Sequence, residues 1–376
     1  MLYDLVVKNG TVVDPAQRIH GPMDVAFRLG RVAALEESIP EGQAAQVLDA
    51  SGLIVTPGLV DIHVHVYPGV SHYGIPADST CLATGATTVA DAGSAGAATF
   101  PGFRWYIIQS VQTRVKAFLN ISAMGMVSSK VGELEDLRWA DVPTAVETAR
   151  EHADLIVGIK VRLSEQLAGK NDLEALSRAQ EAASAIGKPV MVHVGNTHSP
   201  LERILERLRP GDIMTHSFHG HRHGILDDAG RVLAAAVEAK ARGVIFDVGH
   251  GAGSFSFDVG EKALSQGFGP DTISIDLHVY NLKGPVFDLA TTLSKYLHLG
   301  LSLDEVVRLG TEAPARAIGL GDRLGSLRVG CEGDAALLRM EEGRFTFTDS
   351  FKKTATGRRR LVPVAVVKGG RVYKKG

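Results

Sequence analysis

The stretch Thr56-Pro-Gly-Leu-Val-Asp-Ile-His-Val-His-Val66 decides the fold of this chain. After a proline-glycine turn, apolar residues in this stretch alternate with polar ones, as in a strand with one buried face. Side chains two residues apart project from the same face of a strand, so the imidazoles of His63 and His65 lie side by side. Two histidines in that arrangement can chelate a metal ion. We therefore expect a strand that carries two metal ligands.

Outward from this stretch, short apolar runs alternate with longer segments that have the composition and period of helices. Alternation of this kind is typical of a parallel sheet with crossover helices. Eight βα units in this length of chain predict an α/β fold, a closed (β/α)8 TIM-like barrel; an open doubly wound sheet is the alternative. The eight runs are Leu59–Val66, Thr87–Ala90, Val115–Ile121, Leu155–Val161, Pro189–Val194, Asp212–Thr215, Gly243–Phe246 and Thr272–Ile275.

Both ends of the chain have the pattern of β structure. β-branched residues flank Asn9-Gly10 near the start and Gly369-Gly370 near the end, and such pairs accept the positive φ angles of a hairpin turn. We expect one small β-sandwich domain composed of residues 1–54 and 322–376, with the barrel formed by residues 55–321. Two unrelated β segments are the alternative.

The composition is that of a folded protein without a polyanionic partner. Of 376 residues, 45% are hydrophobic and 22% are charged, enough apolar content for a full-sized core. The net charge of -2 gives no basic field for nucleic acid or an anionic membrane. Cys81 and Cys331 are too few for a disulfide framework or a cysteine zinc cluster. No signal-peptide pattern and no apolar run of membrane-spanning length is visible, so we expect a soluble cytoplasmic protein.

Polar residues stand at the carboxyl ends of the predicted strands, which converge on one mouth in a barrel. His193 and His216 end two consecutive runs in matching positions, which favours a metal site facing the two histidines of the first strand. Asp276 ends the last run, where one carboxylate oxygen can bind a metal ion while the other accepts a proton from water. Similar positions are held by three residues that we interpret as structural or as partners of the ligands: Asp91, Asn120 and Asp247.

Lys160 ends the fourth run, where an ammonium group would face the apolar barrel wall beside metal cations. Burial and like charge both lower its pKa toward the neutral amine. A neutral amine can take up carbon dioxide to give a carbamate whose two oxygens could bridge two metal ions. The alternative is a lysine paired with Asp276 or Asp91. Arg162 shares the face of Lys160 and could polarise a carbonyl group or grip a substrate carboxylate; a surface ion pair is its alternative.

Loops beyond the strand ends supply candidates for substrate contact. The histidine-rich segment 216–223 lacks strand spacing after its first residue, so we interpret it as a mobile loop rather than a second metal cluster. The basic segment 352–360 is interpreted as a solvated loop of the small domain. The candidate substrate-binding or ligand-supporting residues are Ser94, Gly96, His219, His250, His278 and Asn281.

These pieces together resemble the amidohydrolase superfamily over essentially the whole chain. The matching pieces are Pro57-Gly-Leu-Val-Asp-Ile-His-Val-His65, Gly85-Ala-Thr-Thr-Val89, Lys160, His193, His216, Asp276 and Glu312-Ala-Pro-Ala-Arg-Ala-Ile-Gly319. The resemblance implies a barrel with a small β-sandwich domain and a binuclear site, commonly of zinc. It also implies the ligands: His63, His65 and Asp276 for one metal ion, His193 and His216 for the other, and carboxylated Lys160 as the bridge.

The residues around these ligands indicate a branch of the superfamily. Dihydroorotases carry an arginine shortly after His-x-His, whereas this chain has Val66 and Tyr67 there. The deacetylase branch, often labelled dihydroorotase-like, is the closer resemblance. Its members hydrolyse acetylated amino acids or 2-hydroxy acids, and the arginine two residues after the bridging lysine, here Arg162, is expected to stabilise the transition state. The resemblance is carried by His63-Val-His-Val-Tyr67, Asp91-Ala-Gly-Ser-Ala-Gly96, Gly102-Phe-Arg104 and Lys160-Val-Arg162.

The chemistry expected of such a site is cleavage of an amide or ester bond by metal-activated hydroxide. Asp276 would take the proton from water and return it to the leaving group. The expected partner is a small acylated molecule. The alternatives are a cyclic-amide hydrolase of the dihydroorotase or hydantoinase type, a deaminase, and a non-catalytic scaffold. The acyl group, the stereochemistry, the metal that is loaded and the formation of a homo-oligomer stay open.

Overall fold

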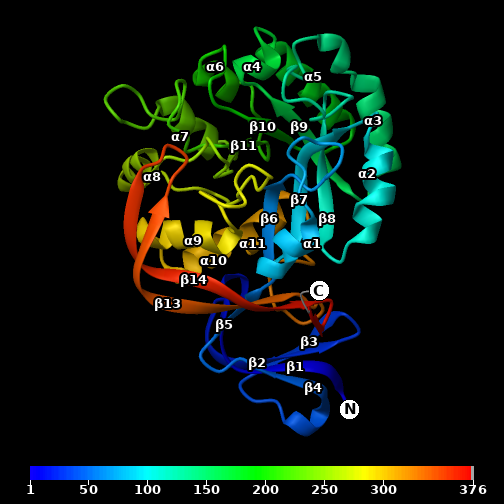
Figure 1. Ribbon diagram of the computed structural model, residues 1–376, viewed down its shortest axis with the longest axis vertical. Coiled ribbons are helices and arrows are strands. Elements are labelled where there is room, and N and C mark those ends of the chain that lie inside the picture. Colours follow the sequence, from blue (N-terminus) through cyan, green and yellow to red (C-terminus); the bar gives the residue numbers. More distant parts are fainter. Residues whose placement is uncertain (374–376) are drawn as a thin grey trace.

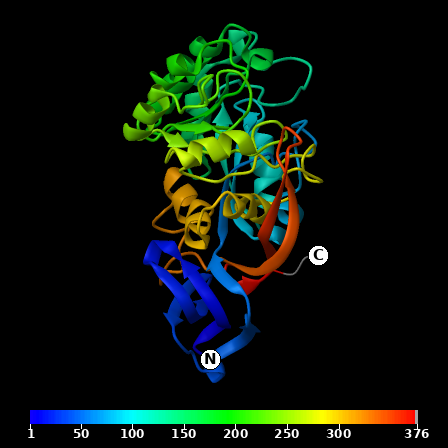
Figure 2. The same ribbon diagram turned by 90° about the vertical axis from the view of Figure 1, so that its left-hand side faces the viewer.

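The computed structural model describes residues 1–373, which form two β-sheets placed end to end, with the helices gathered around one of them, the barrel sheet (Figure 1, Figure 2). The barrel sheet has seven strands and is curled and parallel, whereas the second sheet has eight strands and combines strands from both ends of the chain. The fold class is therefore α/β, a TIM-like barrel with a small β domain built from the two chain ends, as the sequence predicts. Within residues 1–373 we find no helix with the length and apolar character needed to cross a membrane.

Seven barrel strands lie side by side in chain order, and every neighbouring pair is parallel. Their carboxyl ends therefore lie at one edge of the curled sheet, which is where a barrel carries its chemistry. The strands are β6 (Leu59–Val64), β7 (Ala86–Gly96), β8 (Arg114–Asn120), β9 (Ile156–Arg162), β10 (Val190–His193), β11 (Ile213–Thr215) and β12 (Ile245–Phe246).

The eighth predicted run, residues 272–275, is not a regular strand of this sheet. The amide of Ile275 donates to a side-chain carboxylate oxygen of Asp61 on β6 at 3.3 Å instead of to a backbone carbonyl of a neighbouring strand. The buried Asp61 side chain thus replaces one of the backbone hydrogen bonds that a regular strand would make with its neighbour. The ring is closed on either side of the run by isolated parallel bridges, between Asp247 and Thr272 and between Val64 and Leu277.

The helices pack around the outside of the curled sheet (Figure 1). In α5 the buried residues recur at spacings of three and four, the pattern of a helix with one apolar face. Helix α9 is buried on nearly all sides, because strand β14 of the second sheet packs against it. The helices are α1 (Ala77–Thr80), α2 (Phe100–Tyr106), α3 (Val142–Glu151), α4 (Glu165–Ala168), α5 (Asp172–Ala185), α6 (Leu201–Leu205), α7 (Ala234–Ala241), α8 (Phe257–Ser265), α9 (Leu289–His298), α10 (Leu303–Leu309) and α11 (Glu312–Ala317).

The second sheet has the order β15-β14-β13-β5-β1-β2-β3, with β4 paired to β1. The predicted turn at Gly369-Gly370 joins β14 to β15. The predicted turn at Asn9-Gly10 is wrong: β1 continues through it with a bulge, and Gly10 packs so closely on Val55 that a Cβ would lie 2.5 Å from its methyl carbon. The strands are β1 (Tyr3–Asp14), β2 (Ile19–Arg28), β3 (Arg31–Glu36), β4 (Ala44–Asp49), β5 (Ile54–Pro57), β13 (Ala335–Thr348), β14 (Thr354–Lys368) and β15 (Arg371–Val372).

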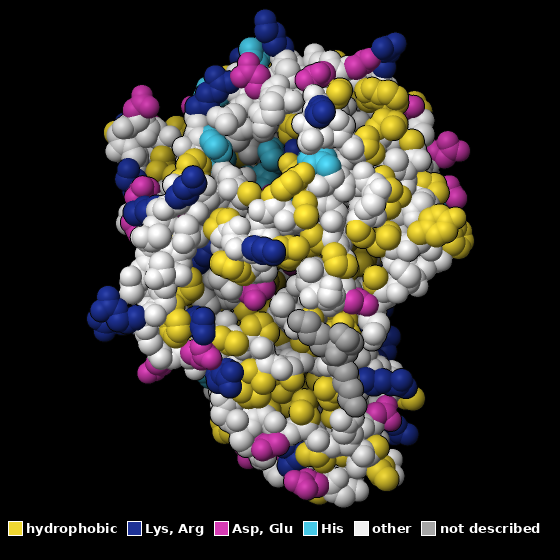
Figure 3. Space-filling model, viewed as in Figure 1, with side chains coloured by type: hydrophobic (Ala, Val, Ile, Leu, Met, Phe, Trp, Pro, Cys, Tyr) yellow, Lys and Arg dark blue, Asp and Glu magenta, His cyan; other side chains and the backbone are white. Residues whose placement is uncertain are grey.

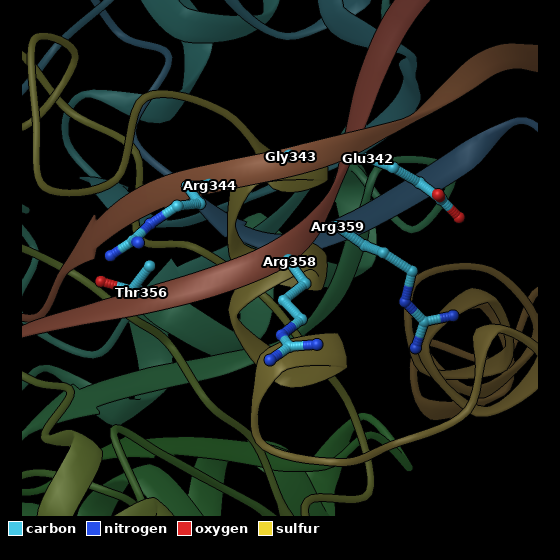
Figure 4. Close-up of a pocket in the computed structure, with 6 residues that line it drawn as sticks. All are labelled: Glu342, Gly343, Arg344, Thr356, Arg358 and Arg359. Atoms are coloured by element: carbon cyan, nitrogen blue, oxygen red, sulfur yellow. The ribbon is translucent and has the colours of Figure 1, made fainter.

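The hairpin of β13 and β14 extends beyond the rest of the second sheet along the side of the barrel (Figure 1, Figure 2). Phe347 and Leu361 of this hairpin belong to the barrel's apolar core, and the Leu361 amide donates to Ser294 of α9 at 2.8 Å. Most of the basic segment 352–360 is therefore strand β14 and not a solvated loop. A groove of about 790 Å³ lies on the hairpin, and its arginine side chains point in different directions (Figure 4); it is lined by Glu342, Gly343, Arg344, Thr356, Arg358 and Arg359.

Candidate active site

The predicted histidine and aspartate ligands meet at the carboxyl end of the barrel. Asp276 Oδ1 lies 3.0 Å from His65 Nε2 and 3.4 Å from His63 Nε2. The ring centroid of His216 lies 4.9 Å from that of His63 and 4.3 Å from that of His193. Figure 3 shows histidine side chains around a hollow on the barrel half of the molecule. Residues from the ends of three strands, β6, β10 and β11, and Asp276 from the last loop thus form one cluster.

His63 is oriented by a two-step hydrogen-bond relay. The Thr215 hydroxyl donates to Asp247 Oδ2 at 2.7 Å, so the Thr215 oxygen is left to accept the Nδ1 proton of His63 at 2.8 Å. Asp247 is fully buried and also accepts hydroxyl protons from Thr272 and Ser274. Burial raises the pKa of Asp247, and these three donors act against that rise. The relay fixes the Nδ1-protonated tautomer of His63 and leaves the Nε2 lone pair for a ligand.

His65, at the end of the same strand as His63, is oriented in a similar way by groups of the neighbouring strand β7. Its Nδ1 lies 2.9 Å from Ser94 Oγ, and the Ser94 hydroxyl also interacts with Asp91. Asp91 accepts backbone protons from Val66 and Ser94 as well. Burial raises the pKa of Asp91 to about 6, in spite of these donors. Ser94, predicted as a substrate contact, therefore lies behind the proposed ligand His65 and supports it.

His193 and His216 are held through different ring nitrogens. Nδ1 of His216 lies 2.6 Å from the Gly249 carbonyl, which can only accept, so Nε2 is its free nitrogen. In His193 the partner is at Nε2: Ser164 gives its hydroxyl proton to the Gly195 carbonyl at 2.6 Å and accepts from Nε2 at 3.0 Å. His193 therefore offers Nδ1 to the cluster.

A divalent metal ion fits this donor set. One ligand atom each from His63, His216 and Asp276 lies within 4.8 Å of the other two. His216 Nε2 is buried and has no hydrogen-bond partner among residues 1–373, a costly situation for a polar atom without a ligand. Burial lowers the pKa of His63, His65 and His193 well below its usual value and that of His216 to about 3. All four imidazoles are therefore neutral at pH 7 and can bind a cation through a lone pair.

Lys160 lies in the same cluster and is completely buried. Its Nζ lies 3.4 Å from His63 Nε2, and no carboxylate oxygen of the described chain lies within 4.0 Å of it, so the alternative of an ion pair with Asp276 or Asp91 is not formed. Gly93 makes room for the side chain, because a Cβ there would lie 2.7 Å from Lys160 Cγ. Burial lowers the pKa of Lys160 to about 7, against the attraction of Asp276. The neutral amine is thus accessible near neutral pH.

Arg162 lies two residues further along β9 and pairs with a carboxylate that sequence reasoning missed. Glu133 Oε1 lies 3.4 Å from Arg162 Nη1, and both side chains are almost fully buried, so this is not a surface ion pair. The guanidinium carbon lies 5.5 Å from the ring centre of Tyr73. Burial opposes the charge, but Glu133, Tyr73 and Asp276 outweigh it and raise the pKa of Arg162 above its usual value. A fixed positive charge therefore stands at the mouth.

A cleft of about 390 Å³ opens beside these groups, a size suited to a small molecule. Of the six residues predicted to contact substrate or support ligands, His278 lies in its wall. Asn281 supports the site from behind, since its Nδ2 donates to the Asp276 carbonyl at 2.8 Å and its Oδ1 accepts from the His278 amide at 2.9 Å. Other residues of the wall include Tyr73, Arg162, His193, Ser254, Asp276 and Tyr280.

The remaining predicted contacts lie deeper in the protein. A side chain at Gly96 would collide with the backbone of Ser122, so this glycine serves close packing. His219 is 1% exposed, and its Nδ1 accepts the amide proton of His221. His250 is completely buried, with Nε2 at 2.7 Å from Nζ of Lys295. The structure therefore does not bring these three residues to the wall of the cleft.

Two residues that sequence reasoning missed, Tyr73 and Glu133, stand beside Arg162. Tyr73 follows His65 by eight residues in a glycine-containing loop, and its place after a ligand-bearing strand was the available signal. Its ring lies 5.1 Å from that of His65 in a stacked arrangement. Glu133 has no comparable signal, because no spacing links this loop residue to the strand end that it contacts.

Two proposed ligands have left-handed backbone conformations, with φ at 66° for His216 and 48° for Asp276. Such values are uncommon for residues other than glycine and are retained where the surrounding structure holds them. They place the two side chains just beyond the regular ends of the strands. Strain at these points agrees with a functional site.

Comparison with known proteins places the chain in a family. The amidohydrolase family model matches residues 54–372. The chain belongs to the amidohydrolase family. It is therefore a hydrolase, and the divalent metal site that this family generally uses agrees with the donor set at the barrel mouth.

Two relatives of this amidohydrolase are named deacetylases. The one from Agrobacterium fabrum is 37% identical over 322 residues, covering 85% of this chain and 79% of the relative. The one from Enterococcus faecalis is 34% identical over 377 residues, covering 99% and 100%. Among solved structures, one titled an adenine deaminase has 34% identity and a TM-score of 0.93, covering 99% and 100%. Another, titled a dihydroorotase, has 33% identity and a TM-score of 0.90, covering 98% of each chain.

Proposed function

We propose that this amidohydrolase is a deacetylase that hydrolyses acetylated amino acids or 2-hydroxy acids. The observation that carries the proposal is the convergence of His63, His216 and Asp276 within 4.8 Å, beside buried Lys160 and the charged group of Arg162. Such a set can activate water and stabilise an oxyanion next to a small cleft. The deacetylase names of the two relatives support the choice of the acetyl group.

The proposed cofactors are two divalent metal ions, which the family resemblance suggests to be zinc. When bound, the ions would lower the pKa of a water molecule and polarise the acyl oxygen. Complete burial of Lys160 and its pKa of about 7 support a carbamate formed with carbon dioxide. The proposed ligands are His63, His65 and Asp276 for one ion, His193 and His216 for the other, and the Lys160 carbamate between them.

The side chains of the protein supply the other parts of the reaction. Asp276 accepts the proton of the attacking water, and Arg162 donates hydrogen bonds to the acyl oxygen as negative charge develops on it. Asp276 then gives the proton to the leaving amine or alkoxide, so the same carboxylate serves amides and esters. His278 carries its proton on Nε2, because its Nδ1 accepts from the Tyr280 amide, and that Nε2 lies 3.9 Å from Asp276 Oδ2. Its imidazole faces the carboxylate at the cleft.

Replacing Asp276 by asparagine tests the proton-transfer role. Asparagine tolerates the left-handed backbone at this position, so the fold is expected to persist while the proton acceptor is lost. We expect kcat on an acetylated substrate to fall by about 10²- to 10⁴-fold. Steady-state kinetics of metal-loaded protein measures this, with circular dichroism as the control for folding. Near-full activity of Asp276→Asn would refute the assignment.

A substrate panel tests the acyl group and the competing reactions. It contains N-acetyl-amino acids of both hands, O-acetyl 2-hydroxy acids, dihydroorotate, a 5-substituted hydantoin and adenine. Preferred release of acetate supports the proposal. Turnover of dihydroorotate or the hydantoin alone would assign a cyclic-amide hydrolase, which is less expected because buried Val66 and Tyr67 provide no cation after His65. Release of ammonia from adenine alone would assign a deaminase.

We also propose a cytoplasmic location and a small acylated molecule, rather than nucleic acid or a membrane, as the partner. The proposed domains are residues 1–54 with 322–376, of which 374–376 lie outside the described residues, and residues 55–321. Strand β5 crosses the boundary at residue 54, so the two domains share a continuous strand there. Size-exclusion chromatography with light scattering decides whether the chain forms a homo-oligomer.

A further inference from the structure

The tip of the β13–β14 hairpin, residues 348–353, rests on loops at the barrel mouth. Figure 1 shows this hairpin running along the barrel toward α8. The ring of Phe351 at the tip lies 5.0 Å from that of His221 in the loop after β11. The neighbouring tip residues contact the segment 247–256 after β12, which we call the β12 loop. A part of the chain far from the site in sequence therefore touches two of its loops.

Ser350 makes four hydrogen-bond contacts with the β12 loop. Its hydroxyl is shared between the His250 carbonyl at 3.2 Å and the Gly251 carbonyl at 3.0 Å. The same oxygen accepts the amide proton of Phe255 at 3.3 Å, and the Ser350 amide donates to the Phe255 carbonyl at 3.0 Å. Backbone groups of the loop that would otherwise need water are thus satisfied by one side chain.

Asp349 fixes the end of the same loop. Its Oδ2 accepts the amide proton of Phe257, the first residue of α8, at 3.0 Å, and its Oδ1 accepts from two amides of the hairpin turn. Ser256, which precedes the helix, provides no cap from its own side chain. The hairpin tip therefore supplies the missing cap of α8.

Lys295 of α9 is completely buried and contacts both the hairpin and the β12 loop. Its Nζ lies 2.8 Å from the carbonyls of Thr348 and Pro285 and 2.7 Å from His250 Nε2. Nδ1 of His250 faces the Gly251 carbonyl at 3.0 Å, so Nδ1 carries the ring proton and Nε2 accepts. Three acceptors thus surround the amine, which matches the three donors of an ammonium group.

The β12 loop held in this way bears on two proposed ligands. Its Gly249 carbonyl accepts the Nδ1 proton of His216 and so sets the tautomer of that ligand. Its Gly251 lies so close to Asp276 that a Cβ would be 2.5 Å from Oδ2. Its next three residues, Ala252 to Ser254, lie in the cleft wall. A displacement of the loop would move a ligand, the proton acceptor and the cleft together.

We propose that the hairpin tip is a positioning device for the active site and that Ser350 is its central positioning residue. The Ser350 hydroxyl holds the carbonyls of His250 and Gly251, and the loop in turn orients His216 and Asp276. The catalytic consequence rests on the proposed function. The positioning of the β12 loop itself rests on the hydrogen bonds of Ser350 and Asp349.

Ser350→Ala tests this device, because it removes the hydroxyl and keeps the backbone pair with Phe255. Losing the donated and the accepted hydrogen bond of this hydroxyl predicts, in metal-loaded protein, a fall in kcat of about fivefold to tenfold with KM within about twofold. Amide hydrogen exchange of residues 249–254 should accelerate by a similar factor. Ser350→Thr retains the hydroxyl and should restore both quantities.

Lys353→Gln is the matched control at the same tip, where Lys353 makes a partly exposed ion pair with Asp258. It should change neither kcat nor exchange of residues 249–254. Unchanged exchange in Ser350→Ala would overturn the proposal, as would equal effects in Lys353→Gln. Faster exchange in Ser350→Ala alone supports the hold on the loop even if the parent cleaves no acetylated compound, an outcome that would count against the proposed function only.

Discussion

Lys160 differs from an ordinary buried lysine because no carboxylate is paired with it in the described chain. An unpaired ammonium group in apolar surroundings is costly, so such a lysine tends to lose its proton. Burial is the largest cause of its lowered pKa, and the neighbouring charge of Arg162 adds to the effect. The nearby polar atom is Nε2 of His63, which carries no proton to repel an added group. These properties favour reaction of the amine with carbon dioxide.

Replacing Lys160 by alanine should therefore remove the proposed bridge without removing the other proposed ligands. We expect loss of most bound metal and a fall in kcat of more than about 100-fold, with partial recovery of both in the presence of formate or acetate, whose oxygens can occupy the same space. Elemental analysis of the purified variant and kinetics with and without the added carboxylate measure this. Lys116→Ala on neighbouring β8, where the amine bonds to the Asp154 carbonyl, is the control and should retain metal. Full metal content in Lys160→Ala would contradict the bridge.

The sequence could predict which side chains converge, because strand ends in a barrel meet at one mouth whatever their spacing. It could not predict what lies behind them. Thr215 orients His63 and Ser164 orients His193 through contacts between different strands, and no sequence period encodes such pairs. Glu133 was missed for the same reason, since it approaches Arg162 from a loop. A sequence shows which residues can bind a metal ion. The tautomer of each histidine depends on hydrogen-bond partners that only the folded structure brings together.

At the level of elements, the irregular segments are the ones that carry the site. Hydrophobic periodicity correctly predicted seven strands, since each hides apolar residues under helices. The eighth run failed as a strand because Asp61 satisfies one of its amides, and a side-chain acceptor leaves no trace in the apolar pattern. The run ends at Asp276, whose left-handed backbone then turns the carboxylate into the cluster. The regular strands form the scaffold, and the irregular segments at their ends orient the proposed ligand side chains toward the cluster.

The β12 loop offers a direct test at this scale. Gly251→Ala would place a Cβ 2.5 Å from Asp276 Oδ2 on a backbone with φ of 56°, so the loop or the carboxylate must move. We expect kcat to fall at least about tenfold. Gly253→Ala is the control in the same loop, because the nearest atom to its Cβ, His221 Nε2, is 3.8 Å away. Kinetics of the two variants side by side would contradict this account if their kcat values were equal.

Across the whole molecule, the two ends of the chain contribute to the barrel as well as to their own sheet. The sequence predicted that the ends meet but not that the hairpin reaches the mouth. The basic composition of segment 352–360 predicted a solvated loop. In the structure, Arg360 of this segment lies 4.5 Å from the ring centre of Phe345 and pairs with Glu341 on the opposite strand. A strand with arginines on its outer face can have the same amino-acid composition as a surface loop. The difference lies in pairing between distant residues, which composition does not record.

The link that ties hairpin to barrel should make the stability of the whole molecule depend on pH. Burial lowers the pKa of Lys295 to about 7, with Asp349 and Asp288 opposing the shift, and the facing His250 is neutral. In the unfolded chain a lysine titrates near pKa 10.4, so above pH 7 the unfolded state binds a proton that the folded state does not. The free energy of unfolding then rises with pH through this group, by up to about 1.4 kcal/mol per pH unit. Below pH 7 both states hold the proton, and its contribution is constant.

Lys295→Met removes this titration while preserving most of the buried side-chain volume. The free energy of unfolding of the parent minus that of the variant should therefore grow between pH 7 and pH 9, by roughly 1–3 kcal/mol. Urea denaturation followed by circular dichroism at several pH values measures the difference, and subtraction cancels groups that titrate alike in both proteins. A difference that stays flat or shrinks over this range would show that Lys295 keeps its proton throughout. The buried amine would then be stabilised by its three acceptors more strongly than burial disfavours its charge.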